Sequence, residues 1–193
     1  MSMNSINPNP PAAPAPAAPS PASAVSPAAP AATPRPAPAA APVPVAAPVL
    51  PPPVPASLAA LGLPFQGVDH TARGVHAEAV ILPDQVVAAG TVMDQAGYSL
   101  DTITGVDWLA QGQMEVVYDF FHPTSGLRVA LRTRVPRDQA ELPTLSGVFP
   151  GANWHERETH DFFGIRFTGH PDLTPFLLPE DATFHPLRKD YAP

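Results

Sequence analysis

The stretch MEVVYDFFHPTSGLRVALRTRV, Met114–Val135, decides the fold. Large and mostly apolar residues occupy every second position from Met114 to Phe120 and again from Leu127 to Val135. A period of two predicts two strands, each with one face against a core and one polar face. The segment His122–Gly126 between them is rich in turn-forming residues, so the two strands are expected to form a β-hairpin.

Charged residues on the polar face of this hairpin indicate a register. An antiparallel pairing that places Asp119 opposite Arg128 also places Glu115 opposite Arg132. Opposite charges then face each other across the two strands, which stabilises such a pair of strands. The sequence therefore predicts a hairpin in the Asp119–Arg128 register.

On the N-terminal side of the hairpin, strand and helix signals alternate. Residues 77–82 are short and apolar and stop at a proline, as a strand would. Asp84 is then expected to cap a helix over residues 85–96, which Gly97 ends. Residues 98–103 predict a second strand.

On the C-terminal side, residues 136–150 are predicted to be a loop. Asn153 and Glu156 have the spacing of a capping box, which predicts a helix from Trp154 to Phe163 that ends at Gly164. A short extended piece follows, and Asp172 is expected to cap a further helical turn that reaches Leu178. The element order β-α-β-β-β-α predicts an α+β fold with an antiparallel sheet, packed helices and an extended C-terminal tail.

Composition divides the 193 residues into two parts. Residues 1–57 contain 19 of the 30 prolines and 18 alanines, and Arg35 is their only charged residue. Proline removes backbone donors and the segment has little to bury, so we predict a disordered arm biased to polyproline II. It lacks the apolar run of a signal peptide or a membrane span. Its role, as an inert tail or as a tether, stays open.

Residues 58–193 are predicted to form one globular domain, since they hold all 12 glycines and almost all the charge. The chain has no cysteine, which excludes disulfides, cysteine nucleophiles and thiolate ligands for zinc or iron–sulfur clusters. The net charge of −7 argues against non-specific binding to nucleic acids.

Polar residues gather between His155 and Asp190, and three hypotheses compete for them. A metal site is disfavoured because His155 and His160 are five residues apart, so on one helix they diverge by about 140°. General acid–base catalysis by Glu156, Glu158 or Asp161 lacks any accompanying nucleophile motif or phosphate-binding glycine loop.

The third hypothesis is an ion-pair network that fixes the architecture or a partner surface, and the residue types favour it. Arg157 and Asp161 are four residues apart, as are Glu156 and His160, which is the spacing of helical side-chain pairs. Glu158 shares a helix face with aromatic residues and is expected to be partly buried. Buried carboxylates need partners, and Arg188 and Lys189 are expected to supply the counter-charges.

Several motifs in this region resemble one family, the C subunit of NADH:quinone oxidoreductase (respiratory complex I). Related subunits occur in F420H2 dehydrogenases and in membrane-bound NiFe hydrogenases. The similarity is specific from residue 148 to 191 and weaker over residues 76–147. The motifs are PGANWHERE at 150–158, DFFGI at 161–165, GHPDL at 169–173, LPED at 178–181 and PLRKDY at 186–191.

The resemblance implies a non-catalytic structural subunit in the peripheral arm of a proton-translocating enzyme, on the cytoplasmic side of a bacterial plasma membrane. It would pack against the large quinone-site subunit and its cluster-bearing neighbour, and touch the membrane only through the complex. No cofactor or metal is expected in this chain; flavin, iron–sulfur clusters and quinone are expected in partner subunits. The alternatives are the equivalent subunit of a hydrogenase or F420H2 dehydrogenase, or a free-standing metal-dependent hydrolase using the His/Glu cluster.

The same resemblance indicates which residues belong to the family motif or to a partner interface, with a docking tail from about Pro171. At Thr174 and Pro175 the sequence departs from the family, which usually has a basic pair there. The expected site residues are Trp154, Glu156, Arg157, Glu158, Asp161, Gly164, His170, Pro171, Asp172, Pro186, Arg188, Lys189 and Asp190.

Overall fold

A computed structural model describes residues 53–192, so most of the predicted disordered arm lies outside the described residues. The folded part begins slightly earlier than the predicted boundary at residue 58. Helix α1 (Ala56–Ala59) already includes Ala56 and Ser57, because the fully buried Leu58 anchors it to the core. Val54 also packs against this core.

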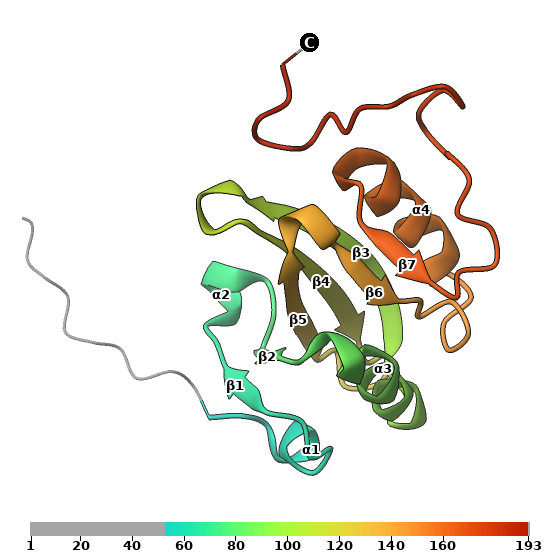
Figure 1. Ribbon diagram of the computed structural model, residues 1–193. Coiled ribbons are helices and arrows are strands. Elements are labelled where there is room, and N and C mark those ends of the chain that lie inside the picture. Colours follow the sequence, from blue (N-terminus) through green and yellow to red (C-terminus); the bar gives the residue numbers. More distant parts are fainter. Residues whose placement is uncertain (1–52, 193) are drawn as a thin grey trace, which may run out of the picture. The chain divides into compact units, whose positions relative to one another are not determined.

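The centre of the domain is a five-stranded sheet with the strand order β1-β2-β5-β4-β3 (Figure 1). The pairing is antiparallel throughout except between β2 and β5, which run parallel. The predicted α+β fold with a mainly antiparallel sheet is therefore confirmed, with one parallel pair that the sequence did not indicate. The strands are β1 (Phe65–Gly67), β2 (Ala77–Val80), β3 (Ser99–Trp108), β4 (Gln113–Phe121) and β5 (Arg128–Pro136).

The predicted hairpin is present as β4 and β5, but the predicted register is wrong by two residues. Asp119 lies opposite Ala130 and Glu115 opposite Arg134. The turn is tighter than expected, because the His122 amide donates to the Leu127 carbonyl at 2.8 Å and further residues pair on both strands. A shift of two leaves every side chain on its predicted face, so the charge complementarity survives with other partners.

The helix predicted over residues 85–96 is present, but its N-terminus differs from the prediction. Helix α3 (Val86–Gln95) is followed by Gly97 at φ +80°, as predicted. Asp84 does not cap it, because this residue lies within a preceding 3₁₀ turn, η1 (Pro83–Gln85). The Gln85 side chain instead accepts a hydrogen bond from the Leu82 amide at 3.0 Å.

Helix α4 (Ala152–Phe163) begins two residues before its predicted start and ends at Gly164, which has φ +72°. The predicted capping box is wrong: Asn153 lies inside the helix, and no side chain caps the N-terminus. Glu156 cannot turn back to the helix start because it is buried against another segment, described below. The predicted helical turn after Asp172 is also absent; Asp172 Oδ1 accepts from the Thr174 amide at 3.3 Å.

The predicted loop 136–150 contains more structure than its composition indicates. It holds the 3₁₀ turn η3 (Arg137–Gln139) and strand β6 (Glu141–Pro143), which pairs in parallel with β7 (Arg166–Thr168). Three-residue strands show no measurable periodicity, which is why the sequence did not reveal them. The remaining elements are α2 (His70–Arg73) and the 3₁₀ turn η2 (Leu109–Gln111).

One face of the main sheet carries the hydrophobic core, and α3 and α4 cover it. Large buried side chains such as Tyr118, Phe120 and Leu131 come from β4 and β5. After β7 the chain has no further helix or strand up to residue 192, and this C-terminal tail, residues 169–192, runs past α4 (Figure 1). Among residues 53–192, no helix combines the length and apolar character needed to cross a membrane.

Candidate functional site

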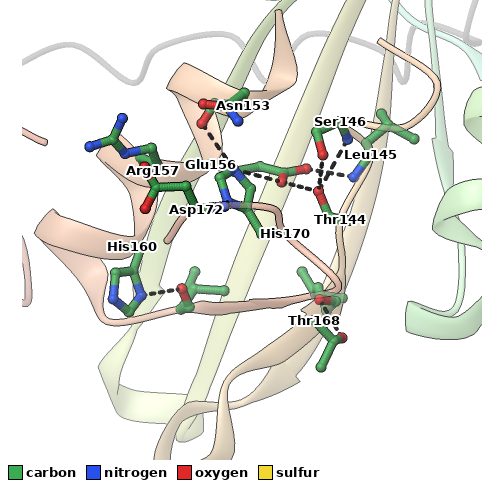
Figure 2. A network of polar contacts seen from close by, with 12 residues as sticks. Thr144, Leu145, Ser146, Asn153, Glu156, Arg157, His160, Thr168, His170 and Asp172 are labelled. Atoms are coloured by element: carbon green, nitrogen blue, oxygen red, sulfur yellow. Dashed lines mark hydrogen bonds and ion pairs between the residues drawn. The ribbon is translucent and has the colours of Figure 1, made fainter. Parts of the chain in front are cut away.

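Glu156 is a buried carboxylate that joins α4 to a loop before it and to the start of the tail. It is fully inaccessible to solvent. Its carboxylate accepts from the Leu145 amide at 2.6 Å and pairs with Thr144 Oγ1 at 2.5 Å (Figure 2). His170 Nε2 lies 3.8 Å from Oε2, with both side chains fully buried. The expected helical pair of Glu156 with His160 does not form; His160 Nδ1 contacts the Ile165 carbonyl at 2.9 Å.

The residues around Glu156 determine its pKa and the tautomer of the neighbouring His170. Burial raises the pKa of Glu156 to about 7, although the hydrogen bonds from Thr144 and Leu145 act in the opposite direction. His170 Nδ1 accepts from the Asp172 amide at 3.1 Å, so a neutral ring carries its hydrogen on Nε2, which faces the Asn153 carbonyl at 3.3 Å. Glu156 therefore keeps its proton to a higher pH than an exposed glutamate does, since burial disfavours the charged carboxylate.

Asp161, one turn further along α4, binds the backbone of the tail. Its Oδ2 accepts hydrogen bonds from the amides of Phe176, Leu177 and Leu178 at 2.9, 2.7 and 3.1 Å. Burial raises the pKa of Asp161, but the three N–H donors together outweigh it and hold the pKa below its ordinary value. The carboxylate thus serves as an anchor for three consecutive residues that have no regular structure.

Arg157 holds the preceding segment of the tail. Its Nε donates to the Thr174 carbonyl at 3.0 Å, and its Nη2 donates to Thr174 Oγ1 at 3.2 Å and to the Pro175 carbonyl at 3.1 Å. The guanidinium also lies over the rings of Trp154 and Phe176, at 5.3 and 5.1 Å. The expected pair of Arg157 with Asp161 is therefore wrong, because tail backbone groups occupy both side chains.

The end of the tail closes the C-terminus of α4. The amide of Leu187 donates to the Phe162 carbonyl at 3.2 Å, and Arg188 Nε donates to the Phe163 carbonyl at 2.7 Å. These carbonyls are among the acceptors that a helix end leaves without partners. Gly164 permits this approach, since a Cβ there would lie 2.5 Å from His185 Nε2 and 2.6 Å from Arg188 Nη2.

A second anchor, on strand β3, holds the predicted site residues Lys189 and Asp190 through Asp107 and Arg137, which the sequence had not singled out as site residues. Asp107 is buried and receives two hydrogen bonds from Arg137, at 2.9 and 3.1 Å, and one from the Lys189 amide at 2.8 Å. Arg137 also bonds Asp190 at 2.5 Å. Burial raises the pKa of Asp107, but Arg137 and the Lys189 amide outweigh it and lower the pKa overall. The one available signal was an aspartate in phase with core residues of a strand.

A comparison with protein families finds a match over the part of the chain that contains α4 and the tail. Residues 79–193 match the family described as the respiratory-chain NADH dehydrogenase 30 Kd subunit. The chain belongs to this family. The predicted resemblance is confirmed, and the residues that anchor the tail lie within the matched range.

A curated relative gives the same result. The C subunit of the NADH-quinone oxidoreductase of Roseiflexus sp. (strain RS-1) is 49% identical over 92 residues, which are 47% of this chain and 53% of the relative. The chain thus spans about half the length of this curated relative.

Two solved structures share the fold. A chain of the membrane-bound sulfane sulfur reductase, an archaeal respiratory membrane complex, is 30% identical with a TM-score of 0.57, over 60% of this chain and 71% of that one. A trypsin-resistant fragment of Nqo5 is 30% identical with a TM-score of 0.50, over 60% of this chain and 92% of that one.

The other residues that were expected in the site differ in their exposure to solvent. Pro186 is half-buried, whereas Pro171 and Asp172 are exposed at the start of the tail. Glu158 is exposed, contrary to the expected partial burial, and Lys189 is exposed although its amide is bound. Trp154 is 55% exposed. Within residues 53–192 there is no cluster of three or more residues able to hold a metal ion.

Proposed function

We propose that this chain is a non-catalytic structural subunit in the peripheral arm of a proton-translocating NADH:quinone oxidoreductase, on the cytoplasmic side of the membrane. Its C-terminal tail would dock on the neighbouring quinone-site subunit. One observation carries the proposal: backbone groups of the tail bind α4 and β3, whereas five of its large apolar side chains are exposed, namely Phe176, Leu177, Phe184, Leu187 and Tyr191. An isolated soluble domain is expected to do the opposite.

The outward side chains form two groups, each containing an aromatic pair. Around α4, the Trp154 and Phe176 rings lie 5.0 Å apart, next to Leu177. Near the end of the tail, the Phe184 and Tyr191 rings lie 5.6 Å apart and Leu187 is close in sequence. All six residues are between 38% and 55% exposed. Aromatic residues of this kind are the usual anchors of protein interfaces.

The tail is also fixed in shape before any partner arrives. Asp161 and Arg157 alone account for six hydrogen bonds to residues 174–178. A segment that is already ordered loses less conformational entropy on binding, which favours association. A pre-formed apolar surface on an extended tail is therefore well suited to a permanent contact between subunits.

The engagement of the polar motif residues supports a structural role for the chain itself. Asp161 and Arg157 use their hydrogen-bonding capacity on backbone groups of the tail, and Glu156 on the loop at residues 144–145. A catalytic acid or base must instead reach a substrate proton. We propose accordingly that flavin, iron–sulfur clusters and quinone are bound by partner subunits and not by this chain.

A second assignment keeps the structural role and changes the complex. The similarity to a chain of the membrane-bound sulfane sulfur reductase indicates that this fold also occurs in a respiratory complex with another reaction. The equivalent subunit of a membrane-bound NiFe hydrogenase or an F420H2 dehydrogenase is the corresponding alternative for this chain.

The test is to isolate the complex through this chain. The full chain carries an N-terminal tag, membranes are solubilised in mild detergent, and co-purifying proteins are identified by mass spectrometry. We expect flavin- and cluster-bearing NADH-oxidising subunits together with a quinone-site subunit. Recovery should fall for Asp161→Ala, which frees the tail, and not for Asp84→Ala, an exposed residue of η1.

Two outcomes would contradict the proposal in different ways. A NiFe large subunit without the NADH-oxidising subunits would assign the chain to the hydrogenase branch. A chain that is recovered alone would contradict the structural role altogether.

A further inference from the structure

The charged side chains of α4 and the tail are of two kinds. Some form hydrogen bonds or ion pairs within the domain, and others form none there. Six charged side chains bond within the domain: Glu156, Arg157, Asp161, Asp172, Arg188 and Asp190. The basic residue Arg188, which the sequence suggested as a docking group, is among them, because it caps a carbonyl of α4. The free charge of the docking surface must therefore come from other residues.

Four charged side chains of α4 and the tail are exposed and make no hydrogen bond or ion pair within residues 53–192. Three are acidic, Glu158, Glu180 and Asp181, and one is basic, Lys189. The surface that faces outward is thus acidic. The internal bonds occupy both arginines of α4 and the tail and leave three of their seven carboxylates free.

Glu180 and Asp181 are adjacent and occupy the corner of a turn. The Ala182 amide donates to the Pro179 carbonyl at 3.0 Å, which closes this turn. In sequence the pair lies between the two exposed apolar groups, following Leu177 and preceding Phe184. Two like charges held together without a counter-ion repel each other, and a cationic partner would relieve this repulsion.

We infer that the tail docks on an apolar protein surface that carries lysine or arginine side chains, and that Glu180 and Asp181 are the charges this surface recognises. The inference rests on the proposed function and specifies the chemistry of its partner. Apolar side chains would supply most of the affinity, and the acidic pair would fix register and speed association.

The same charges argue against an anionic lipid surface as the occupant. Exposed tryptophan, phenylalanine and tyrosine residues also occur in segments that lie on membranes. Those segments carry lysine and arginine, because the cytoplasmic leaflet is negatively charged. An acidic pair between two apolar groups would be repelled there. The net charge of −7 likewise disfavours a second copy of this chain as the occupant.

The experiment compares three double variants of the full chain in the membrane complex. Glu180→Lys with Asp181→Lys reverses the pair, and Glu180→Gln with Asp181→Asn neutralises it. Asp84→Lys with Asp94→Lys is the matched control, since it makes the same charge change at exposed acids elsewhere. The readout is the quinone-site subunit retained by the tagged chain as the salt concentration rises.

At about 0.15 M salt we expect the reversed variant to retain about tenfold less partner, the neutral variant an intermediate amount, and the control the wild-type amount. Retention by the wild-type chain should fall with salt, and retention by the neutral variant should depend on salt less. Amide hydrogen exchange over residues 174–191 should be the same in all variants, which shows that the tail itself is intact.

Other results would overturn the inference. A reversed variant that retains partner as well as the control, in an intact complex, would show that the acidic pair is not recognised. Binding of the wild-type chain to vesicles of equal parts phosphatidylglycerol and phosphatidylcholine would assign the surface to lipid. Failure of even the wild-type chain to retain any oxidoreductase subunit would instead refute the proposed function on which the inference rests.

Discussion

The β4–β5 hairpin and the C-terminal tail are both ordered, but by opposite means. The hairpin is held by its own backbone ladder and by apolar side chains such as Tyr118 and Leu131, each 1% exposed. The tail has no ladder, exposes its apolar side chains, and is held by side chains of other elements, chiefly Asp161 and Arg157. The order of the hairpin is therefore encoded locally, and that of the tail at a distance.

This difference means that the two regions can be disturbed separately. Loss of core packing should destabilise the whole domain, because the sheet and the helices share one core. Loss of an anchor on α4 should release the tail and leave the hairpin intact, because few apolar groups of the tail are buried. The predictions below test this separation, from the largest effect to the smallest.

The largest effect is expected in the core. Leu131→Ala removes a side chain that is 1% exposed at the centre of β5. The lost burial and the remaining cavity should lower the free energy of unfolding by about 3–4 kcal/mol. Chemical denaturation monitored by circular dichroism measures this change. If the tail lost its hydrogen-exchange protection at a denaturant concentration where the core stays folded, the two regions would already be separable in the wild-type protein.

The second effect is a pH dependence that originates at Glu156. The folded protein holds a proton there up to about pH 7, whereas the unfolded chain releases it near the ordinary value of 4.5. The unfolded state therefore binds fewer protons between these two values, so the free energy of unfolding falls as the pH rises through this window. The loss should be about 3 kcal/mol, because the pKa of Glu156 rises from 4.5 to about 7 and each pKa unit corresponds to about 1.4 kcal/mol.

Glu156→Gln is the matched variant for this effect, because glutamine resembles the protonated carboxyl and cannot ionise. We expect its stability to equal that of the wild type near pH 5 and to exceed it near pH 8, as measured by thermal unfolding across the pH range. Parallel pH profiles for the two proteins would show that Glu156 is ionised throughout the window and would contradict the raised pKa.

Features with a local cause could be predicted from the sequence. Alternating side chains revealed β4 and β5, and glycines marked the ends of α3 and α4, where Gly97 and Gly164 have positive φ. The hairpin register could not be predicted correctly, because two registers that differ by two residues present the same faces. The decisive contact was a turn hydrogen bond from the His122 amide, which residue types alone do not specify.

The sequence indicated some of the residues that hold the tail, such as Asp161 and Arg157, but not their contacts. Motif residues of α4 do gather around the tail, as expected of one site. Their partners were misjudged because helical spacing suggested local pairs, such as Arg157 with Asp161, whereas distant backbone groups compete for both side chains. Asp107 and Arg137 were missed for the same reason, since they lie 30 residues apart in sequence and meet only in the folded sheet.

The third prediction frees the tail alone. Asp161→Ala leaves the amides of Phe176, Leu177 and Leu178 without their acceptor. We expect the free energy of opening of residues 174–178 to fall by about 2 kcal/mol, as loss of hydrogen bonds to a charged acceptor does. Hydrogen exchange in this segment should then be roughly 30-fold faster, with β4 and β5 unchanged. Glu158→Ala, at an exposed residue of the same helix, serves as the control.

The smallest effect is the difference in stability between Gly164→Ala and Gly126→Ala. It separates backbone strain from the contact between Gly164 and the tail. Gly164 and Gly126 have nearly the same backbone conformation, with φ +72° and +71°. A Cβ at Gly126 would meet nothing within 4 Å, whereas one at Gly164 would lie 2.5 Å from the His185 ring. In both alanine variants the free energy of unfolding should therefore fall by about 1–2 kcal/mol, because alanine must adopt the left-handed conformation.

Only Gly164→Ala should also displace the tail, at a further cost of about 1 kcal/mol, because His185 and Arg188 must move to admit the methyl group. The two variants compared by thermal unfolding and by limited proteolysis of the tail separate these contributions, since the shared strain cancels in the difference. Equal stability and equal protease resistance would mean that the end of the tail does not rest on Gly164. The anchored tail would then depend on Asp161 and Arg157 at residues 174–178 and on the contacts of Asp107 and Arg137 with residues 189–190, and not on the end of α4.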